Sequence, residues 1–230
     1  MVSFLVIIVL SYLIGSLPTA VWVGKLIYKV DIREHGSGNA GATNTFRVLG
    51  WKCGVFVSLI DIFKGFVATF YISQIGFLAG EIPITIDIWN MDVFMRVVAG
   101  LFAVVGHMYP VFAGFKGGKG VITAAGMLYG IEPLSISLAL TVFGIILFTS
   151  RYVSLASIIA SFSYPIFLLI LRYGFGMDYL DGSLMVFSSV VALGIILKHI
   201  PNIRRLIQGT ENRIKSFSPS KGKLNEDNVT

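Results

Sequence analysis

The chain has 230 residues, of which 55% are hydrophobic and only 13% charged, and its mean hydropathy is +0.82. A water-soluble domain cannot bury so much apolar surface, so this composition excludes a soluble globular protein and places the chain in a lipid bilayer. The formal net charge is +6, and the single cysteine, Cys53, excludes an internal disulfide.

A helix that crosses a bilayer needs about 20 mostly apolar residues. The sequence predicts helices at 3–24, 53–72, 93–113, 120–131, 134–150, 152–173 and 182–198. Pro18 is expected to kink the first helix. Because no basic residue precedes its apolar run, this helix is predicted to be a retained span rather than a signal peptide. We expect seven spans, with six or five as alternatives if the shorter helices do not cross.

The basic residues agree with a seven-span topology. If the loop 25–52 is cytoplasmic and the sides alternate from there, all of the 18 Lys and Arg residues except Lys64, Arg96 and Arg172 lie on the cytoplasmic side. The positive-inside rule then places the amino terminus outside and the carboxy terminus in the cytoplasm. Residues 1–216 are predicted to form one membrane domain, and the polar residues 217–230 a disordered cytoplasmic tail.

Four polar segments fall on this same predicted cytoplasmic face. They are His35–Gly50, Gly106–Gly120, Arg151–Ser157 and His199–Glu211, and they contain all three histidines of the chain. Loops that share one face can converge on a single site. The loops on the other face offer no comparable set of polar groups.

The residue types in these segments predict a phosphate site. Glycines let backbone N–H groups approach an anion closely, and helix amino termini add partial positive charge. Arg47 can bind a phosphate with two hydrogen bonds, while Lys116 and Lys119 supply point charges. Each segment alone could be an ordinary turn or a positive-inside marker. Their occurrence together favours binding of more than one phosphate.

Two ionisable residues lie inside a predicted span. Asp61 and Lys64 share a helix face at i,i+3 and can neutralise each other. A structural ion pair and a ligand contact are both consistent with this placement. The predicted cytoplasmic face has no close cluster of carboxylates, so we expect no metal and no cofactor, and a reaction that uses an already activated donor.

The chain resembles a bacterial family of integral membrane enzymes, the acyl-phosphate–glycerol-3-phosphate acyltransferases of the PlsY type. The resemblance rests on "GSGNAGATNTFRVLG", "GHMYPVFAGFKGGKGV", "RYVSLAS" and "HIPNIRRLIQGTE" and extends over about residues 7–213. It implies transfer of a fatty acyl group from acyl phosphate to the 1-hydroxyl of glycerol 3-phosphate, giving lysophosphatidic acid and phosphate. It also implies an all-α membrane fold in the bacterial cell membrane, with the active site facing the cytoplasm.

For this reaction we expect a cradle around one phosphate, cations for the second, and side chains that position glycerol 3-phosphate. The expected catalytic residues are Ser37, Arg47, Lys116, His199 and Asn202. The expected binding residues are Gly38, Asn39, Gly41, Thr43, Asn44, Gly117, Gly118, Lys119, Arg151, Ser154 and Glu211. His199 or a substrate phosphate could accept the hydroxyl proton, and the resemblance favours the substrate.

The expected partners are the two substrates and membrane lipid, with no nucleic acid and a monomeric protein. A transporter of a phosphorylated solute is the alternative function. That alternative predicts a site near the middle of the membrane with access from both sides. The gathering of polar segments on one face favours the enzyme.

Overall fold

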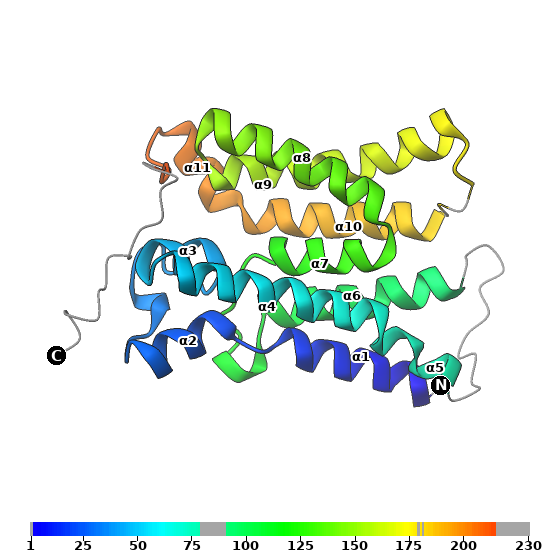
Figure 1. Ribbon diagram of the computed structural model, residues 1–230, viewed down its shortest axis with the longest axis horizontal. Coiled ribbons are helices and arrows are strands. Elements are labelled where there is room, and N and C mark those ends of the chain that lie inside the picture. Colours follow the sequence, from blue (N-terminus) through cyan, green and yellow to red (C-terminus); the bar gives the residue numbers. More distant parts are fainter. Residues whose placement is uncertain (1, 79–90, 179, 181, 215–230) are drawn as a thin grey trace.

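The computed structural model describes residues 2–78, 91–178, 180 and 182–214, and the regular secondary structure in that part of the chain is helical (Figure 1). The helices are α1 (Val2–Gly15), α2 (Thr19–Ile27), η1 (Ile32–Glu34), α3 (Ala42–Val48), α4 (Trp51–Phe70), η2 (Ile72–Gln74), α5 (Ile75–Leu78), α6 (Met91–Met108), η3 (Val111–Ala113), α7 (Val121–Ile131), α8 (Pro133–Ser150), α9 (Val153–Leu169), η4 (Ile170–Gly174), α10 (Gly182–Lys198) and α11 (Ile200–Ile207).

Five helical segments are long and apolar enough to cross a membrane. They are Val2–Ile27, Trp51–Gln74, Met91–Ala113, Pro133–Ser150 and Val153–Gly174. A sixth results if α10 and α11, which are bent by 55° to each other, are counted as one span. The prediction of an all-α, multi-pass membrane protein is therefore confirmed, while the predicted tail at 217–230 lies outside the described residues.

The remaining predicted span, the fourth in chain order at 120–131, corresponds to α7, which is short. Its 11 residues would extend for about 16 Å, roughly half of the hydrocarbon thickness of a bilayer. The alternation of sides on which the predicted orientation rests depends on this helix, so the count of seven stays a prediction.

The ends of the predicted spans agree with the structure to within a few residues, but three local features differ. The first predicted helix is not merely kinked: it is broken at Leu17 and Pro18, because proline lacks the N–H group that would continue the helical ladder. Helices α3 and α11 were not predicted. The Phe46 ring of α3 packs directly on Gly54 of α4, where a Cβ atom would come within 2.3 Å of the ring.

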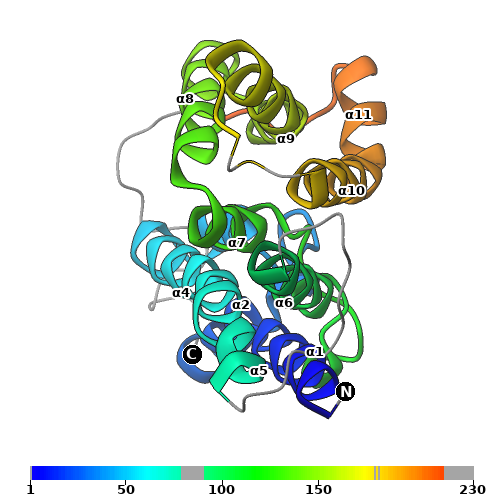
Figure 2. The same cartoon turned by 90° about the vertical axis from the view of Figure 1, so that its right-hand side faces the viewer.

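Helix α7 lies in the middle of the bundle. Figure 2 shows it between a group formed by α1, α2, α4 and α6 and a second group formed by α8, α9 and α10. Glycines hold it against α4: a Cβ atom at Gly65 would lie 2.1 Å from the Thr123 carbonyl oxygen, and one at Gly126 would lie 2.0 Å from the Ile62 carbonyl oxygen. Such close backbone contact is the usual way for helices to pack in lipid.

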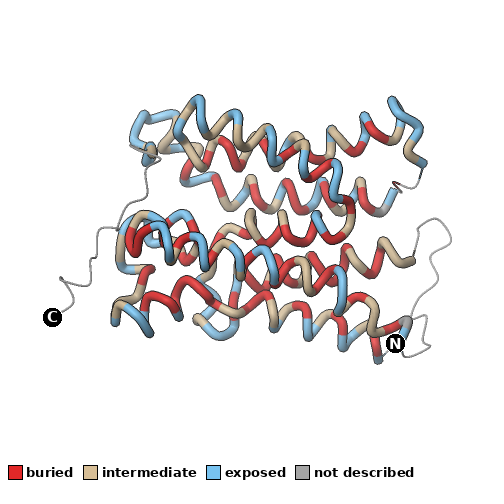
Figure 3. Tube along the Cα trace, viewed as in Figure 1, coloured by how far each residue is buried: buried red, intermediate tan, exposed pale blue. Residues whose placement is uncertain are grey.

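The outward faces of the helices are apolar. Figure 3 shows buried residues where helices face one another and exposed residues on the opposite sides, along α8 and α9 for example. Large apolar side chains occupy many of these exposed positions, including Phe148 at 67%, Phe162 at 61% and Leu193 at 57% exposure. An apolar surface of this extent fits contact with lipid.

Candidate active site

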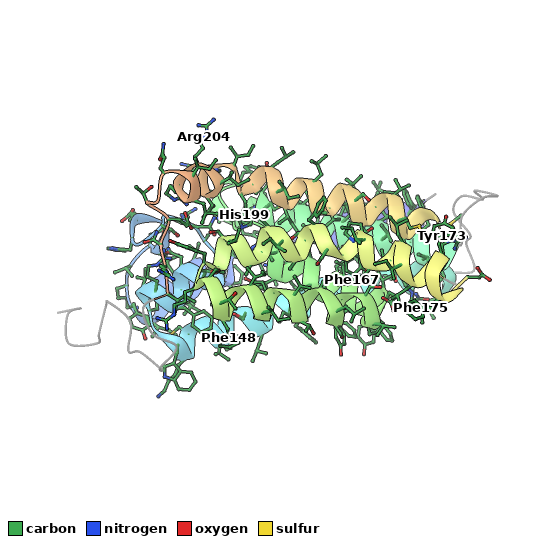
Figure 4. The ribbon with its side chains drawn as sticks, turned by 90° about the horizontal axis from the view of Figure 1, so that it is seen from above. Phe148, Phe167, Tyr173, Phe175, His199 and Arg204 are labelled. Carbon is green, nitrogen blue, oxygen red and sulfur yellow. The ribbon has the colours of Figure 1, made fainter. Side chains whose placement is uncertain are left out.

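The four polar segments lie at one end of the bundle, which we call the polar end. Figure 4 shows His199 and Arg204 there, with Tyr173 and Phe175 at the opposite end. Helices α3 and α11 occupy the same end in Figure 1. Hydrogen bonds described below join these segments to one another.

Asn44 organises the glycine-rich loop that precedes α3. Its buried side-chain amide donates to the carbonyl oxygens of Ile32 and His35, both at 3.0 Å, and its Oδ1 accepts from the Ser37 N–H at 2.8 Å. Because the amide is fully engaged inside the loop, we revise the expected role of Asn44 from direct phosphate binding to shaping the loop. Gly36 and Gly38 adopt positive φ angles of 64° and 72°, which only glycine tolerates readily.

The other loop residues that we expected to bind phosphate are more accessible than Asn44. Ser37, Gly38 and Thr43 are exposed, and Asn39 and Gly41 are half-buried. The Ser37 hydroxyl forms no hydrogen bond with any residue that the structure describes. These residues are therefore accessible to a ligand at the polar end, in contrast to Asn44.

An ion pair that we did not predict fastens this loop to the next one. The Asp31 carboxylate accepts from the backbone and the guanidinium of Arg33 and lies 3.2 Å from Lys25 Nζ. Arg33 Nη1 also donates to the Ala113 carbonyl oxygen at 2.8 Å. The Arg33 guanidinium holds the pKa of Asp31 well below its usual range. In the sequence, only the i,i+2 spacing of Asp31 and Arg33 could have indicated this ion pair.

Gly117 and Gly118 pack the second loop onto the end of α6. The Gly118 N–H donates to the His107 carbonyl oxygen at 3.1 Å. A Cβ atom at Gly118 would lie 2.0 Å from His107 Nε2, and one at Gly117 would lie 2.0 Å from the His107 carbonyl oxygen. Close packing therefore already explains these two glycines, for which we had expected phosphate contacts. Lys116 is exposed beside them.

Glu211 is the centre of a polar network that joins three segments. Its Oε1 accepts from Asn202 Nδ2 at 2.8 Å and from the Ser154 hydroxyl at 3.0 Å, and its Oε2 accepts from Arg205 Nε at 2.7 Å. Lys119 Nζ donates to the Asn202 Oδ1. Burial raises the pKa of Glu211, but its hydrogen bonds outweigh this effect and keep the pKa below the ordinary value. Glu211 is therefore a carboxylate at neutral pH.

Three cations surround this single carboxylate. Arg47 lies within electrostatic range of Glu211 and Arg205, and Lys119 lies within range of all three. Burial lowers the pKa of Lys119 to about 8 and also lowers the pKa of Arg47. Positive charge thus exceeds negative charge by two units in this partly buried cluster. Such an excess suits the binding of a multiply charged anion. Arg205 was not among the residues expected in the site.

His199 and Arg151 flank the network. His199 is 2% exposed, and its Nδ1 lies 2.8 Å from the Ile195 carbonyl oxygen. A carbonyl can only accept, so Nδ1 carries the hydrogen and Nε2 keeps a lone pair in the neutral ring. Arg151 ends α8 with a φ of 63°, and its carbonyl oxygen accepts from the Ile214 N–H at 2.8 Å. Its backbone therefore holds the segment after α11 against the α8–α9 turn.

The ion pair predicted inside the second span is present and has further partners. Lys64 Nζ lies 2.8 Å from Asp61 Oδ1, and both side chains are almost fully buried. Lys64 also donates to the Leu17 carbonyl oxygen at 3.1 Å, while Asp61 Oδ1 lies 3.4 Å from the Thr19 hydroxyl and 3.7 Å from His107 Nδ1. These contacts join the break between α1 and α2 to α4 and α6, which favours the structural interpretation of the pair.

No three His, Cys, Asp or Glu side chains in the described part of the chain lie close enough to hold a metal ion together. The Glu211 carboxylate is already occupied by Asn202, Ser154 and Arg205. The site as built offers cations and hydrogen-bond donors rather than metal ligands.

A mostly apolar cavity begins beside the network. Residues of α7, α8, α9 and α10 line it, and Val121 and Ile195 lie at its polar end. Val121 follows the Lys119–Gly120 pair directly, and the Ile195 carbonyl oxygen is the one that binds His199. Leu140, which also lines the cavity, is 44% exposed on the lipid-facing surface. The cavity lining therefore extends from residues next to the polar site to a residue on the lipid-facing side of the bundle.

Comparison with known proteins agrees with this arrangement. The model of the family described as "Glycerol-3-phosphate acyltransferase" matches residues 5–209. The glycerol-3-phosphate acyltransferase of Salinibacter ruber is 47% identical over 224 residues, which cover 96% of this chain and 97% of that protein. The protein of the same name from Chlorobium limicola is 48% identical over 232 residues, with 93% and 97% covered.

Two solved structures are also similar. Both are crystal structures of PlsY (YgiH), an integral membrane glycerol 3-phosphate acyltransferase, one in the glycerol 3-phosphate form and one in the lysophosphatidic acid form. Each aligns with a TM-score of 0.73 and 38% sequence identity and covers 92% of this chain. The alignment covers 96% of the first of these chains and 95% of the second.

Proposed function

This chain belongs to the glycerol-3-phosphate acyltransferase family, and on that premise we propose that it transfers a fatty acyl group from acyl phosphate to the 1-hydroxyl of glycerol 3-phosphate. It is an acyltransferase of phospholipid synthesis. The products are lysophosphatidic acid and inorganic phosphate. The named activity of the relatives disfavours the alternative of a transporter, as does the gathering of the polar side chains at one end of the bundle.

The observation that carries this proposal is the group of cations at the mouth of the apolar cavity. Two substrates that both bear phosphate repel each other, so a site that brings them together must supply fixed positive charge. Arg47, Lys119 and Arg205 supply it around Glu211. The cavity beside them can hold the acyl chain while its phosphate stays at the polar end.

The reaction itself needs little covalent help from the protein. The oxygen of the 1-hydroxyl attacks the carbonyl carbon of the acyl phosphate, the bond from that carbon to the phosphate oxygen breaks, and phosphate leaves with its electron pair. The hydroxyl proton passes to a phosphate oxygen of the substrate. An acyl phosphate is an activated anhydride, so no enzyme-bound acyl intermediate is required.

The side chains at the polar end divide between the two substrates. Ser37 and the exposed backbone around Gly38 would hold one phosphate with Arg47, and Lys116 and Lys119 would neutralise the other phosphate and the charge that develops on the carbonyl oxygen. Electrostatic stabilisation of this kind is often the largest contribution to catalysis.

The positioning of glycerol 3-phosphate would fall to the Glu211 network. Asn202 and Ser154 are held by Glu211, and the His199 ring is held by the Ile195 carbonyl with its Nε2 lone pair available. We propose that His199 orients the hydroxyl of glycerol 3-phosphate through Nε2. A substrate phosphate oxygen, rather than His199, then accepts the proton of that hydroxyl. We also propose that the protein acts as a monomer without a cofactor.

For the topology we propose seven spans, with α7 as the short one, in the bacterial cell membrane. The polar end would face the cytoplasm and the amino terminus the outside, in line with the positive-inside rule. Single cysteines in a Cys53→Ala background test this. Ser37→Cys should react with a membrane-impermeant reagent only from the cytoplasmic side, and Phe175→Cys, at an exposed position at the opposite end of the bundle, only from outside. Reversed labelling would overturn the orientation.

The decisive experiment for the reaction is incubation of the purified protein with both proposed substrates. Phosphate release and lysophosphatidic acid formation should each require acyl phosphate and glycerol 3-phosphate together. Rapid acyl transfer from acyl-coenzyme A, with none from acyl phosphate, would overturn the proposed donor. A chelator should leave turnover unchanged, and a loss that added magnesium restores would contradict the assignment of the site to cations and donors alone.

A further inference from the structure

The far end of the apolar cavity contains a buried hydroxyl group without a partner. Tyr164 of α9 lines the cavity and is only 2% exposed. Its hydroxyl oxygen has no hydrogen-bond partner among the residues that the structure describes. Five other buried hydroxyls in the described residues are also without a partner, and Tyr164 differs from them because its side chain lines the cavity.

The distance from the polar end to Tyr164 is suited to an alkyl chain. Tyr164 lies eleven residues after Val153, the first residue of α9, which corresponds to about 16 Å along the helix. Ser188 of α10, which also lines the cavity, lies ten residues before Lys198, or about 15 Å from the same end. Ile136 of α8 also lines the cavity and lies fourteen residues before the last residue of that helix, or about 21 Å from the polar end, which is about one helical turn beyond Tyr164.

The walls between the two ends are mostly apolar, with Ala124, Leu128 and Val191 among the lining residues and Ser161 as a polar exception. The Ser188 hydroxyl donates to the Met185 carbonyl oxygen at 3.0 Å, so its hydrogen is already used. Tyr164 has the largest side chain in the lining.

We propose that Tyr164 closes the far end of the acyl cavity and sets the longest acyl chain that the enzyme uses well. The proposal rests on the proposed function, because it takes the occupant of the cavity to be the acyl chain of the donor. The cavity begins beside Lys119 and His199, so a chain whose phosphate binds there has its methyl end directed toward Tyr164.

The Tyr164 ring acts on a chain that reaches it through its size. The ring blocks further methylenes, each of which would otherwise improve binding roughly fourfold by being buried. Its hydroxyl has no partner among the described residues of the free protein either, so binding of a chain adds no further cost there. Preference should therefore rise with chain length and then fall sharply.

The test is a series of acyl phosphates of increasing chain length, with kcat/KM measured for each at saturating glycerol 3-phosphate. In the Tyr164→Ala variant the preferred length should increase, and the longest chains should gain at least tenfold relative to the parent. In Tyr164→Trp the preferred length should decrease. In Tyr164→Phe the length profile should equal that of the parent, because the ring stays in place and the hydroxyl has no partner among the described residues to lose when a chain binds.

A matched control is Tyr173→Ala, since Tyr173 is 74% exposed at the opposite end of the bundle from His199 (Figure 4). Its length profile should equal that of the parent. If Tyr164→Ala does not fold, the comparison of Tyr164→Leu with the parent decides, because that exchange removes the ring and keeps an apolar side chain. Unchanged length profiles in the variants that change the size of this side chain, with an active parent, would overturn this inference alone. A parent that uses no acyl phosphate of any length would overturn the proposed donor instead.

Discussion

Replacing Asn44 tests how the glycine-rich loop keeps its shape. Asn44→Ala removes two hydrogen bonds of 3.0 Å and one of 2.8 Å, all inside the loop. At about 1 kcal/mol each, the loop conformation loses about 3 kcal/mol. If the bound state needs that conformation, kcat/KM should fall roughly 100-fold. Asn44→Asp should be at least as damaging, because a carboxylate oxygen would face the carbonyl oxygens of Ile32 and His35.

Two measurements separate this role from direct contact with phosphate. Initial rates with each substrate varied give the loss in kcat/KM. Amide hydrogen exchange at Ser37, measured without substrate, should accelerate in Asn44→Ala, since the exchange-protecting acceptor is gone. A side chain that only touched phosphate would leave this exchange unchanged. The control is Thr141→Val on α8, which loses one local hydrogen bond of 2.9 Å and should keep parental activity. Parental kcat/KM in Asn44→Ala would refute the reasoning.

Three further predictions concern charge. Arg47→Lys keeps the positive charge but loses the planar fork, so activity should fall by about 2–4 kcal/mol in transition-state binding, or roughly 30- to 1,000-fold, with unchanged thermal stability; an initial rate equal to that of the parent would contradict the assignment. Because burial lowers the pKa of Lys119 to about 8, its charge is present below that pH and lost above it. The ratio kcat/KM should therefore decline as pH rises through about 8, and in Lys119→Arg this decline should move to higher pH; a pH profile identical in both proteins would rule Lys119 out. Asp61→Ala leaves the Lys64 ammonium buried without its counter-charge and should cost about 3–5 kcal/mol of stability, while the Asp61→Leu, Lys64→Met double variant should recover much of the loss in thermal unfolding. Equal melting temperatures for the parent and Asp61→Ala would show that the pair does not brace the fold.

The spans could be predicted because a run of about 20 apolar residues has few alternatives in lipid. Trp51–Phe70 and Pro133–Ser150, for example, were expected at 53–72 and 134–150. Helix α3 was missed because its sequence, ATNTFRV, has weak helix propensity and depends on packing against α4. The position of the break at Pro18 could be predicted, but the contact of Lys64 with the Leu17 carbonyl oxygen beside it could not, because no local pattern contains it.

The sequence could predict which segments form the candidate site. It could not predict which side chains contact one another there. Topology alone brings the four polar segments to one end. The bond from Lys119 to Asn202, and from there to Glu211, joins residues far apart in the chain, and its pattern depends on the tertiary structure. The roles of Asn44, Gly117 and Gly118 changed for the same reason: their partners are other loop and helix backbone atoms.

The lipid-facing side of the apolar cavity determines whether the rate depends on the donor concentration in the membrane or on that in water. Leu140 lines the cavity and also lies on the lipid-facing surface, so for the proposed long-chain donor we expect entry from the bilayer rather than from water. The rate then follows the mole fraction of donor among the lipids or detergent molecules around the protein. Adding inert lipid at constant total donor should slow the reaction by dilution within the membrane plane. Glycerol 3-phosphate arrives from water, so the rate should depend on its concentration in the aqueous phase. The concentrations of the two substrates therefore refer to two different phases.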